Sequence, residues 1–273
     1  MTPTLSTIHV YPVKSCAPLA LDEAVVEGRG LAGDRRWMLV DADDAFVTGR
    51  KFPRLTLVVA HPQVDALRLD APGMPTLRVE VPDAGSARVD SEVWGAAVRP
   101  RVAADSAHAW FSDFLGHPVR LVYMDDGCAR FVRAKYEGRY GRDGDQVSFA
   151  DAFPLMLISQ ASLDALNARL EVAVPMLRFR PNIVIAGTTE HAEDDWKRIR
   201  IGAIEFEVAK ACTRCVFTTV DFERGQFDPT GEPLRTLIGY RRAPDGVRFG
   251  QNLIARGRGI VRLGDPVEIL EDA

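Results

Sequence analysis

The chain has 273 residues, of which 47% are hydrophobic and 26% are charged, and its formal net charge is −4. This length allows one large domain or two modest ones, with ample residues for a core. The small negative charge argues against a nucleic-acid-binding surface, and no apolar run approaches the roughly 20 residues that span a membrane. Residues 1–6 lack the basic and apolar regions of a secretory signal, so we expect a cytoplasmic location.

Short strands dominate the first hundred residues. Runs of β-branched and aromatic residues predict strands over residues 5–13, 36–41, 55–60, 77–81 and 93–102. Glycine and aspartate mark turns at 30–35 and 41–44. This pattern predicts a compact β-rich unit over residues 1–103.

Helices are few in the predicted structure. Residues 104–106 provide N-cap candidates for a helix over 107–115 that ends at Gly116. Leucines spaced by three and four residues predict a second helix over 160–170, and a short third helix is expected over 232–240. The polar, glycine-rich stretch 127–144 is typical of a mobile linker or lid.

The second half of the chain continues mainly as strands. They are expected over 153–158, 182–187, 200–210 and 249–255, and on both sides of a turn within 260–270. The predicted fold class is therefore α+β and β-dominated. Its predicted parts are a β-rich domain at 1–103, a connecting helix and loop at 104–147, and a second domain at 148–273.

Two of the four cysteines form a Cys-x-x-Cys pair. Cys212 and Cys215 stand three residues apart, with Arg214 between them and Lys210 just upstream. The pair is predicted to open a strand over 216–221. Neighbouring cations lower the pKa of a thiol, so thiolate chemistry is expected at this position.

Four kinds of site remain open for this pair. A structural zinc site needs four ligands, yet Cys16 and Cys128 are isolated and no histidines pair at ligand spacing. A thioredoxin-like dithiol opens a helix rather than a strand. The remaining alternatives are two thiols that pack as small apolar side chains, or one thiolate that binds a soft metal.

Cationic and hydroxyl side chains together favour a phosphorylated, anionic ligand. Ser159 is predicted where a strand ends and a helix begins, and free N–H groups at such a place can hold phosphate. Arg178 and Arg180 are predicted on one side of an extended segment, and a guanidinium suits bidentate phosphate binding. Further candidates from the first half are Lys14, Ser15, Arg35 and Arg36. Each alone is equally compatible with an N-cap or a salt bridge.

A set of short motifs runs through the chain. In the second half, Phe-Arg-Pro-Asn-Ile-Val-Ile, Glu-Asp-Asp-Trp, Ala-Cys-Thr-Arg-Cys, Phe-Gly-Gln and Gly-Asp-Pro-Val stand at 179–185, 193–196, 211–215, 249–251 and 264–267. In the first half, Val-Tyr-Pro-Val-Lys-Ser and Gly-Asp-Arg-Arg-Trp stand at 10–15 and 33–37. The former resemble the MOSC domain, the molybdenum-cofactor sulfurase C-terminal domain, and the latter resemble the β-barrel-like domain that precedes it.

This two-domain arrangement is most similar to the amidoxime-reducing component and its bacterial relatives. The resemblance implies a molybdenum-dependent oxidoreductase that binds a molybdopterin-type molybdenum cofactor and reduces N-hydroxylated compounds, including N-hydroxylated bases and amidoximes. It also implies that Cys215 is the metal ligand and catalytic residue, whereas Cys212 is less critical. The implied cofactor-binding residues are Lys14, Ser15, Arg35 or Arg36, Ser159, Arg180, Asn182, Thr213, Arg214 and Cys215.

The chain departs from some members of this family in two respects. It shows neither the cysteines of a plant-type [2Fe–2S] domain nor an N-terminal targeting or membrane segment. We therefore expect a soluble protein that receives electrons from a separate electron-transfer protein and has no membrane or nucleic-acid partner. The alternative is a non-catalytic carrier of the cofactor, or of sulfur as a Cys215 persulfide. Asp221 is a candidate proton-transfer residue, although a turn residue is the simpler interpretation.

Overall fold

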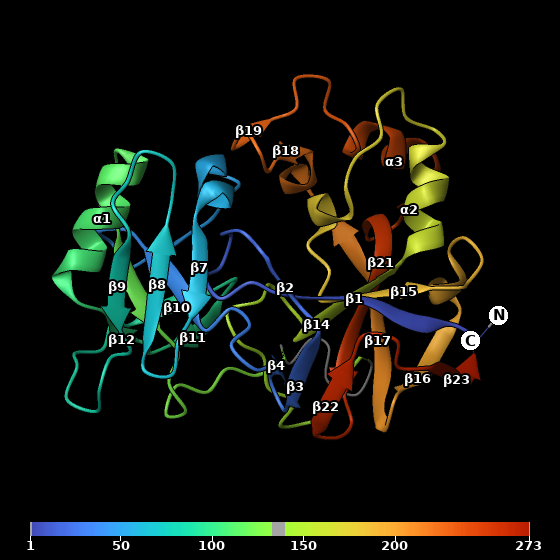
Figure 1. Ribbon diagram of the computed structural model, residues 1–273, viewed down its shortest axis with the longest axis horizontal. Helices are drawn as coiled ribbons and strands as arrows, with labels where there is room; N and C mark the ends of the chain where they lie inside the picture. The colour runs from blue at the N-terminus through green and yellow to red at the C-terminus, as the bar shows by residue number, and fades with distance from the viewer. Residues whose placement is uncertain (1, 133–139, 273) are drawn as a thin grey trace.

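The computed structural model describes residues 2–132 and 140–272. Figure 1 shows two halves side by side, a smaller one that contains α1 and a larger one that contains α2 and α3. None of the described helices has the length and apolar character needed to cross a membrane. The fold is β-dominated with few helices, as predicted.

In its described residues, the smaller half consists mainly of short antiparallel sheets and one α-helix. Its four-stranded sheet has the order β12-β13-β5-β6, formed by Arg101–Val102, Arg120–Tyr123, Trp37–Val40 and Phe46–Val47. A second sheet contains β7 (Val59–Pro62), β8 (Ala66–Asp70) and β9 (Leu77–Glu80), and a hairpin contains β10 (Ser91–Val93) and β11 (Ala96–Val98). Helix α1 (Asp105–Leu115) buries Trp110, Phe111 and Phe114 against these sheets and ends at Gly116, whose φ is 62°.

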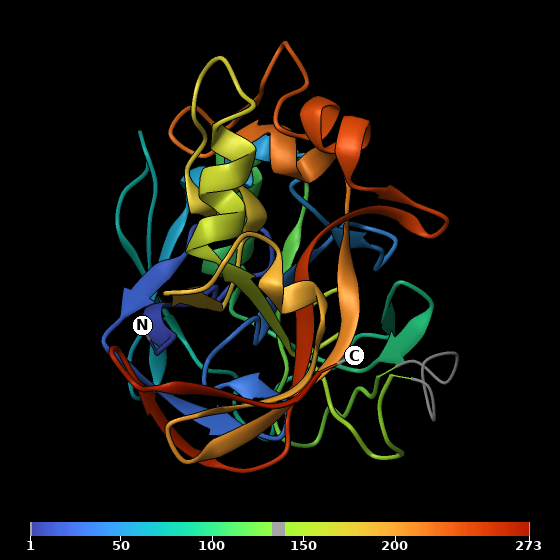
Figure 2. The same cartoon turned by 90° about the vertical axis from the view of Figure 1, so that its right-hand side faces the viewer.

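The larger half is built on a nine-stranded sheet. Its order is β2-β1-β15-β14-β21-β17-β16-β23, and β20 also pairs with β21. In this order, the first eight strands are Leu19–Leu21, Thr4–Val10, Ile183–Ala186, Leu155–Ser159, Gly246–Ala255, Ile204–Arg214, Trp196–Ile201 and Val267–Asp272, and β20 is Arg242–Ala243. Strands β14 and β15 are parallel, and α2 (Gln160–Asn167) follows β14 directly. Figure 2 shows α2 and α3 (Leu234–Tyr240) together at one end of the molecule.

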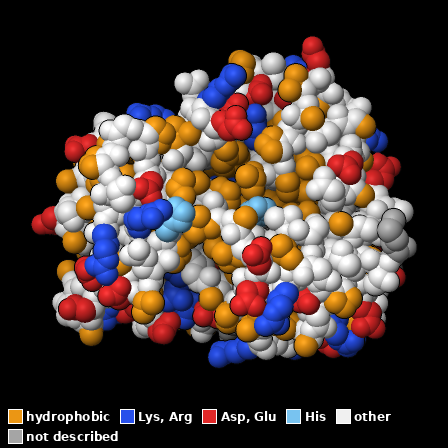
Figure 3. Space-filling model, in the orientation of Figure 1, with side chains coloured by type: hydrophobic (Ala, Val, Ile, Leu, Met, Phe, Trp, Pro, Cys, Tyr) orange, Lys and Arg blue, Asp and Glu red, His pale blue; other side chains and the backbone are white. Residues whose placement is uncertain are grey.

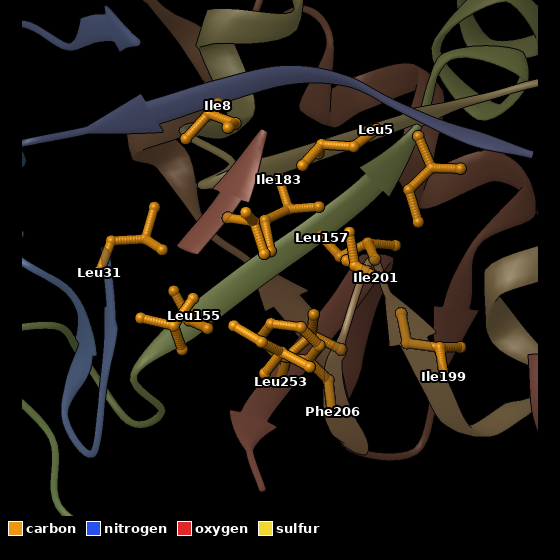
Figure 4. Close-up of a cluster of buried hydrophobic side chains, with 14 of the residues drawn as sticks. Leu5, Ile8, Leu31, Leu155, Leu157, Ile183, Ile199, Ile201, Phe206 and Leu253 are labelled. Carbon is orange, nitrogen blue, oxygen red and sulfur yellow. The ribbon is translucent and has the colours of Figure 1, made fainter. Parts of the chain in front are cut away.

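Strands from the start of the chain complete the larger half. Strand β1 pairs with β15, and β3 (Glu23–Glu27) lies between β4 (Gly30–Leu31) and the C-terminal β22 (Gly259–Arg262). Leu5, Ile8 and Leu31 are consequently buried with Leu157 and Phe206 in one core (Figure 4). On the face shown in Figure 3, hydrophobic side chains gather in a hollow between the two halves.

Three predicted strands were wrong in part. Residues 55–60 begin in a 3₁₀ helix, η1 (Pro53–Leu57), because Pro53 has no N–H for a sheet and its carbonyl accepts the Thr56 hydroxyl at 2.8 Å. The predicted strand 200–210 is two strands, β16 and β17, that turn at Gly202 with a φ of 57°. The cysteine pair ends β17 rather than opening a strand.

The stretch after the cysteines is also mainly helical. Residues Val216–Thr219 form a 3₁₀ helix, η5, because the hydroxyls of Thr218 and Thr219 bond back to carbonyls three residues earlier. Only Val220–Asp221 form a strand, β18, which pairs with β19 (Gln226–Phe227). The predicted linker or lid at 127–144 falls partly on residues 133–139, which lie outside the described residues.

Candidate functional site

A cavity of about 400 Å³ lies where the two halves meet. The smaller half and the loop after β1 supply Lys14, Ser15, Arg35, Thr48, Arg50 and Trp94. The larger half supplies the segments 150–153, 155–156, 178–180, 210–215 and 217–218, together with Asn182 and Asn252. The cavity therefore joins residues that are far apart in the sequence.

The lining of this cavity is strongly cationic. Among the described residues it contains seven Lys or Arg side chains and a single carboxylate, that of Asp151. The seven are Lys14, Arg35, Arg50, Arg178, Arg180, Lys210 and Arg214. A concave wall with one sign of charge concentrates ligands of the opposite sign, so the cavity suits an anion.

Several of these side chains are presented by a strained backbone. Of the six non-glycine residues with positive φ in the described part of the chain, four line the cavity: Ser15, Arg35, Trp94 and Arg180. Left-handed backbone is unfavourable for residues with a side chain, and such residues cluster at functional sites. The positive φ values, 71° at Ser15 and 55° at Arg180 among them, mark this cavity as a candidate site.

Arg180 is a buried cation with spare donor capacity. It is the C-cap of the 3₁₀ helix η3 (Met176–Phe179), and its Nη1 donates to the Cys16 carbonyl at 2.8 Å. Its Nη2 is buried and has no hydrogen-bond partner among the described residues. Burial lowers the pKa of Arg180 to about 10. A buried unsatisfied donor on a cavity wall is explained by a ligand that supplies the missing acceptor.

Arg35 is held more completely. Its Nη1 donates to Asp34 at 2.5 Å and to the Asn182 side-chain oxygen at 3.1 Å. Asn182 donates in turn to the His9 carbonyl at 3.1 Å. The Asn182 side chain is only 1% exposed. Its hydrogen bond to Arg35 helps to fix the position of the Arg35 guanidinium.

Lys14 and Asp151 form a second cluster of charged side chains in the lining of the cavity. The Lys14 ammonium donates to the Phe149 carbonyl at 2.8 Å and to Asp151 at 2.5 Å, and Arg50 donates to Asp151 at 2.9 Å. Burial lowers the pKa of Lys14 to about 8, although Asp151 opposes this shift. The Asp151 side chain is half exposed, and although its partial desolvation would raise its pKa, the charges of Lys14 and Arg50 hold that pKa well below its usual range.

Cys215 is a free, partly exposed thiol at the turn between β17 and η5. Its backbone is fixed because its carbonyl accepts bonds from the Thr218 N–H at 3.1 Å and the Thr218 hydroxyl at 2.9 Å. The β17–β21 pairing is irregular between Val208 and Lys210 and between Ala211 and Thr213, and such bulges are common beside functional sites. Cys212 is also free, and burial raises the pKa of its thiol.

The geometry separates the two cysteines of the pair. Residues 212–214 lie in the extended strand β17, so the Cα atoms of residues three apart are roughly 10 Å from each other. A disulfide needs a Cα separation below about 7 Å. The pair is therefore not placed to form a disulfide. The described residues also contain no group of three or more His, Cys, Asp or Glu arranged to hold one metal ion.

The structure gathers most of the predicted site residues but not all. Lys14, Ser15, Arg35, Arg180, Asn182, Thr213, Arg214 and Cys215 all line the cavity. Arg36 does not, because it donates to the Met124 carbonyl at 2.8 Å and pairs with Asp126. Between the two neighbouring arginines, the cavity therefore selects Arg35.

Ser159 is likewise absent from the described lining. It is fully buried and serves as the N-cap of α2, because its hydroxyl accepts the Ser162 N–H at 3.1 Å. The Glu193 carboxylate already occupies its backbone N–H at 3.1 Å. Because that N–H already has an acceptor and Ser159 does not line the cavity, the described contacts do not support the phosphate role predicted for Ser159.

For three other candidate residues, the hydrogen bonds in the structure indicate a different or additional role from the one predicted. Arg178 lies in η3 rather than in an extended segment, and it donates to the Thr219 carbonyl at 2.7 Å. Asp221 accepts backbone N–H bonds from Glu223 and Arg224, which is the pattern of a turn residue. Arg214 donates to the carbonyls of Phe249 and Phe179, so its guanidinium also braces the wall behind the cysteine.

Sequence reasoning missed the residues that approach from the smaller half and from the loop before β14. Thr48, Arg50, Trp94 and Asp151 all line the cavity. The sequence carries a weak signal only for Trp94, since Trp94-Gly95 is the turn of the β10–β11 hairpin and both residues have positive φ. Lys14 and Asp151 are separated by 137 residues, which no local pattern can bridge.

Comparison with known proteins agrees with this architecture. Residues 2–118 match the MOSC N-terminal beta barrel domain, and residues 144–268 match the MOSC domain. Mitochondrial amidoxime-reducing component 1 of Xenopus laevis is 35% identical over 278 residues, which cover 96% of this chain and 81% of that protein. Its counterpart from Mus musculus is 36% identical, covering 98% and 82%, and that from Homo sapiens is 34% identical, covering 98% and 83%. The chain therefore belongs to the family of MOSC-domain proteins that includes the amidoxime-reducing components.

Proposed function

We propose that this cavity binds a molybdenum cofactor of the molybdopterin type and that the protein reduces N-hydroxylated compounds, such as N-hydroxylated bases and amidoximes. The observation that carries the proposal is a free thiol, Cys215, on the wall of a cavity whose described lining includes seven cationic side chains. The membership of the chain in the family of the amidoxime-reducing components supports the reaction class.

The residues present fit such a group. A thiolate is a soft ligand suited to molybdenum. Both cysteines are partly exposed, but Cys212 packs against a hydrophobic core cluster, which leaves Cys215 as the thiol that a bound group could reach with less competition from packing. The phosphate of a pterin would meet Arg180, which has an unsatisfied buried donor, and Arg35. When bound, the molybdenum group would supply the two-electron redox chemistry.

Other residues of the cavity would bind and orient the cofactor and the substrate. Ser15 and Thr213 line the cavity and carry hydroxyls, and Asn182 fixes the direction of Arg35. Lys14 holds a proton at Nζ that its lowered pKa of about 8 makes easier to release than that of an exposed lysine. Electrons would come from a separate protein.

The test is purification of the protein from molybdate-fed cells, followed by metal and pterin analysis. Reduction of benzamidoxime or hydroxylaminopurine is then assayed with a chemical electron donor. Bound molybdenum with turnover supports the proposal. Bound molybdenum without turnover under any donor favours the cofactor carrier. A chain with no molybdenum and a Cys215 persulfide would exclude the enzyme and favour a sulfur carrier.

A further inference from the structure

The buried ring of Tyr11 packs against two of the arginines that line the cavity, Arg35 and Arg180. Tyr11 is fully buried and belongs to the segment that leaves β1. Its hydroxyl donates to the Pro181 carbonyl at 3.0 Å, and its backbone N–H donates to Asp34 at 2.8 Å. The ring is thus held from both ends, so its position is fixed independently of any ligand.

Two guanidinium groups lie over this one ring. The Cζ atom of Arg180 is 4.1 Å from the ring centroid, and that of Arg35 is 4.4 Å from it. Two cations so close to one ring repel each other, and each needs a compensating attraction. Cation–π attraction to the electron-rich face of an aromatic ring supplies part of it.

The two arginines differ in how their charges are balanced. Arg35 forms an ion pair with buried Asp34 at 2.5 Å. Arg180 makes no ion pair with a carboxylate within residues 2–132 and 140–272, and its charge instead faces the rings of Tyr11, Phe217 and Phe222. The only hydrogen bond that its guanidinium makes in that part of the chain is to the Cys16 carbonyl. Arg180 is therefore held in place without being neutralised.

This difference has a consequence for ligand binding. A carboxylate beside Arg180 would occupy its N–H groups and compete with an incoming anion. An aromatic ring attracts the cation through its face and takes up none of the N–H groups at the edge of the guanidinium plane. We propose that Tyr11 is a positioning residue for anion binding: its ring holds the Arg180 guanidinium at the cavity wall with its charge unneutralised and available to a phosphate-bearing ligand.

The first experiment separates the ring from the hydroxyl. The full-length chain is produced in cells that cannot make pterin cofactors, and binding of inorganic pyrophosphate is measured by calorimetry. Tyr11→Leu should weaken binding by at least about tenfold, whereas Tyr11→Phe, which keeps the ring, should stay within about twofold of wild type. In an Arg180→Ala background, Tyr11→Leu should have a smaller effect than in wild type, because only Arg35, which Asp34 also holds, then lies over the ring.

A matched control addresses simple destabilisation. Phe111 is a fully buried aromatic residue of α1 that does not line the cavity, so Phe111→Leu removes a ring from a core elsewhere in the molecule. It should lower thermal stability yet leave pyrophosphate affinity unchanged. Equal loss of affinity in the Phe111→Leu and Tyr11→Leu variants would overturn the proposal, as would full affinity in Tyr11→Leu.

A second measurement keeps the proposal testable if Tyr11→Leu does not fold. Phenylalanine and its mono-, di- and trifluorinated analogues are placed at position 11 by nonsense suppression, which weakens the ring quadrupole with little change in shape. Pyrophosphate affinity should fall stepwise with each added fluorine. Affinity that does not depend on fluorination, or a wild-type chain that binds no pyrophosphate, would contradict the role of Tyr11. Because the probe is an anion without metal or pterin, these outcomes are independent of whether the protein reduces N-hydroxylated compounds.

Discussion

Ser15, Arg35, Trp94 and Arg180 share a left-handed backbone that costs on the order of 1 kcal/mol or more for a residue with a side chain. The surrounding contacts hold them there: the Arg35 N–H donates to the Tyr11 carbonyl at 2.8 Å, and the Arg180 N–H donates to Leu177 at 3.1 Å. The strained backbone at these four positions sets the direction of side chains that line the cavity. This is the expected behaviour of a preorganised binding site.

The two cysteines should respond differently to substitution. Cys215→Ala should abolish reduction of benzamidoxime and lower the molybdenum content while the circular dichroism spectrum stays unchanged, because it removes the proposed ligand. Cys212→Ala is the matched control and should retain most of the activity, since that thiol is packed against the core. Equal loss from both variants would instead indicate a dithiol or a zinc site.

The Lys14–Asp151 pair predicts a pH dependence of stability. The Asp151 carboxyl ionises near pH 3.8 in the unfolded chain and at a lower pH in the folded one, because Lys14 and Arg50 outweigh the effect of burial. The pair therefore contributes stability above about pH 4 that is lost as pH falls below it. Urea unfolding of wild type and Asp151→Asn should show a stability difference at neutral pH that shrinks between about pH 5 and pH 3. A difference that does not change with pH would show that Asp151 is not ionised by these partners.

At the scale of elements, the loop 48–50 and the 3₁₀ helix η5 contact each other beside the cavity that both line. Thr48 and Arg50 line the cavity from the smaller half, and Phe217 of η5 lines it from the larger half. Gly49 lies directly against Phe217, so closely that a β-carbon at position 49 would overlap the ring. This close approach requires glycine.

Gly49→Ala should therefore displace Phe217 and destabilise the protein by about 1–3 kcal/mol, as overpacking usually does. Cofactor retention should fall as well, since Phe217 is two residues from Cys215. Phe217→Leu in the same chain should restore part of the loss, which a double-mutant cycle of unfolding free energies would reveal. The control is Gly239→Ala in α3, where nothing lies within 4 Å of the added carbon. Equal destabilisation by both alanines would rule out the proposed contact.

Sequence patterns predicted best the elements whose signals are local. Helix α1 ends at Gly116 as predicted, and α2 begins after Ser159 because the strand before it and its leucine spacing are both visible in the sequence. The β-branched runs at 55–57 and 216–219 were predicted as strands but form 3₁₀ helices. In both, a threonine hydroxyl bonds back to a carbonyl, and this competes with sheet pairing in a way that strand propensity does not register.

At the scale of the whole molecule, the two halves are interlocked by the first 31 residues. Strand β1 pairs with β15, and β3 provides the partner of the C-terminal β22. Leu5 and Ile8 lie in the same core as Leu157 and Phe206. The predicted domain boundaries at 103 and 148 remain a prediction, as does the cytoplasmic location.

This interlocking predicts that the C-terminal half does not fold alone. A fragment of residues 144–273 loses β1, leaves the edge of β15 unpaired and exposes the core positions that Leu5 and Ile8 cover. Its NMR spectrum should lack native dispersion, and adding residues 1–118 as a separate chain should restore order. A well-dispersed spectrum of the isolated fragment would contradict this prediction.

The residues of the site that lie in short sequence motifs could be predicted as candidates from the sequence. Cys215, Arg180 and Lys14 were each identified from sequence, and the structure brings all three to one cavity. The residues that surround these side chains were not predicted from sequence. Asp151 pairs with Lys14 across 137 residues of sequence, and Tyr11 bonds to the Pro181 carbonyl across 170 residues. Such pairings arise only when the two halves come together.

The central claim is that the cavity holds a molybdenum cofactor with Cys215 as the metal ligand. The most direct test is the molybdenum and pterin content of the purified full-length protein and of its Cys215→Ala variant, both from cells with an active cofactor pathway and ample molybdate. We predict close to one molybdenum and one pterin per wild-type chain, and a clear loss of molybdenum in the variant. A folded wild-type chain that contains neither would contradict the account.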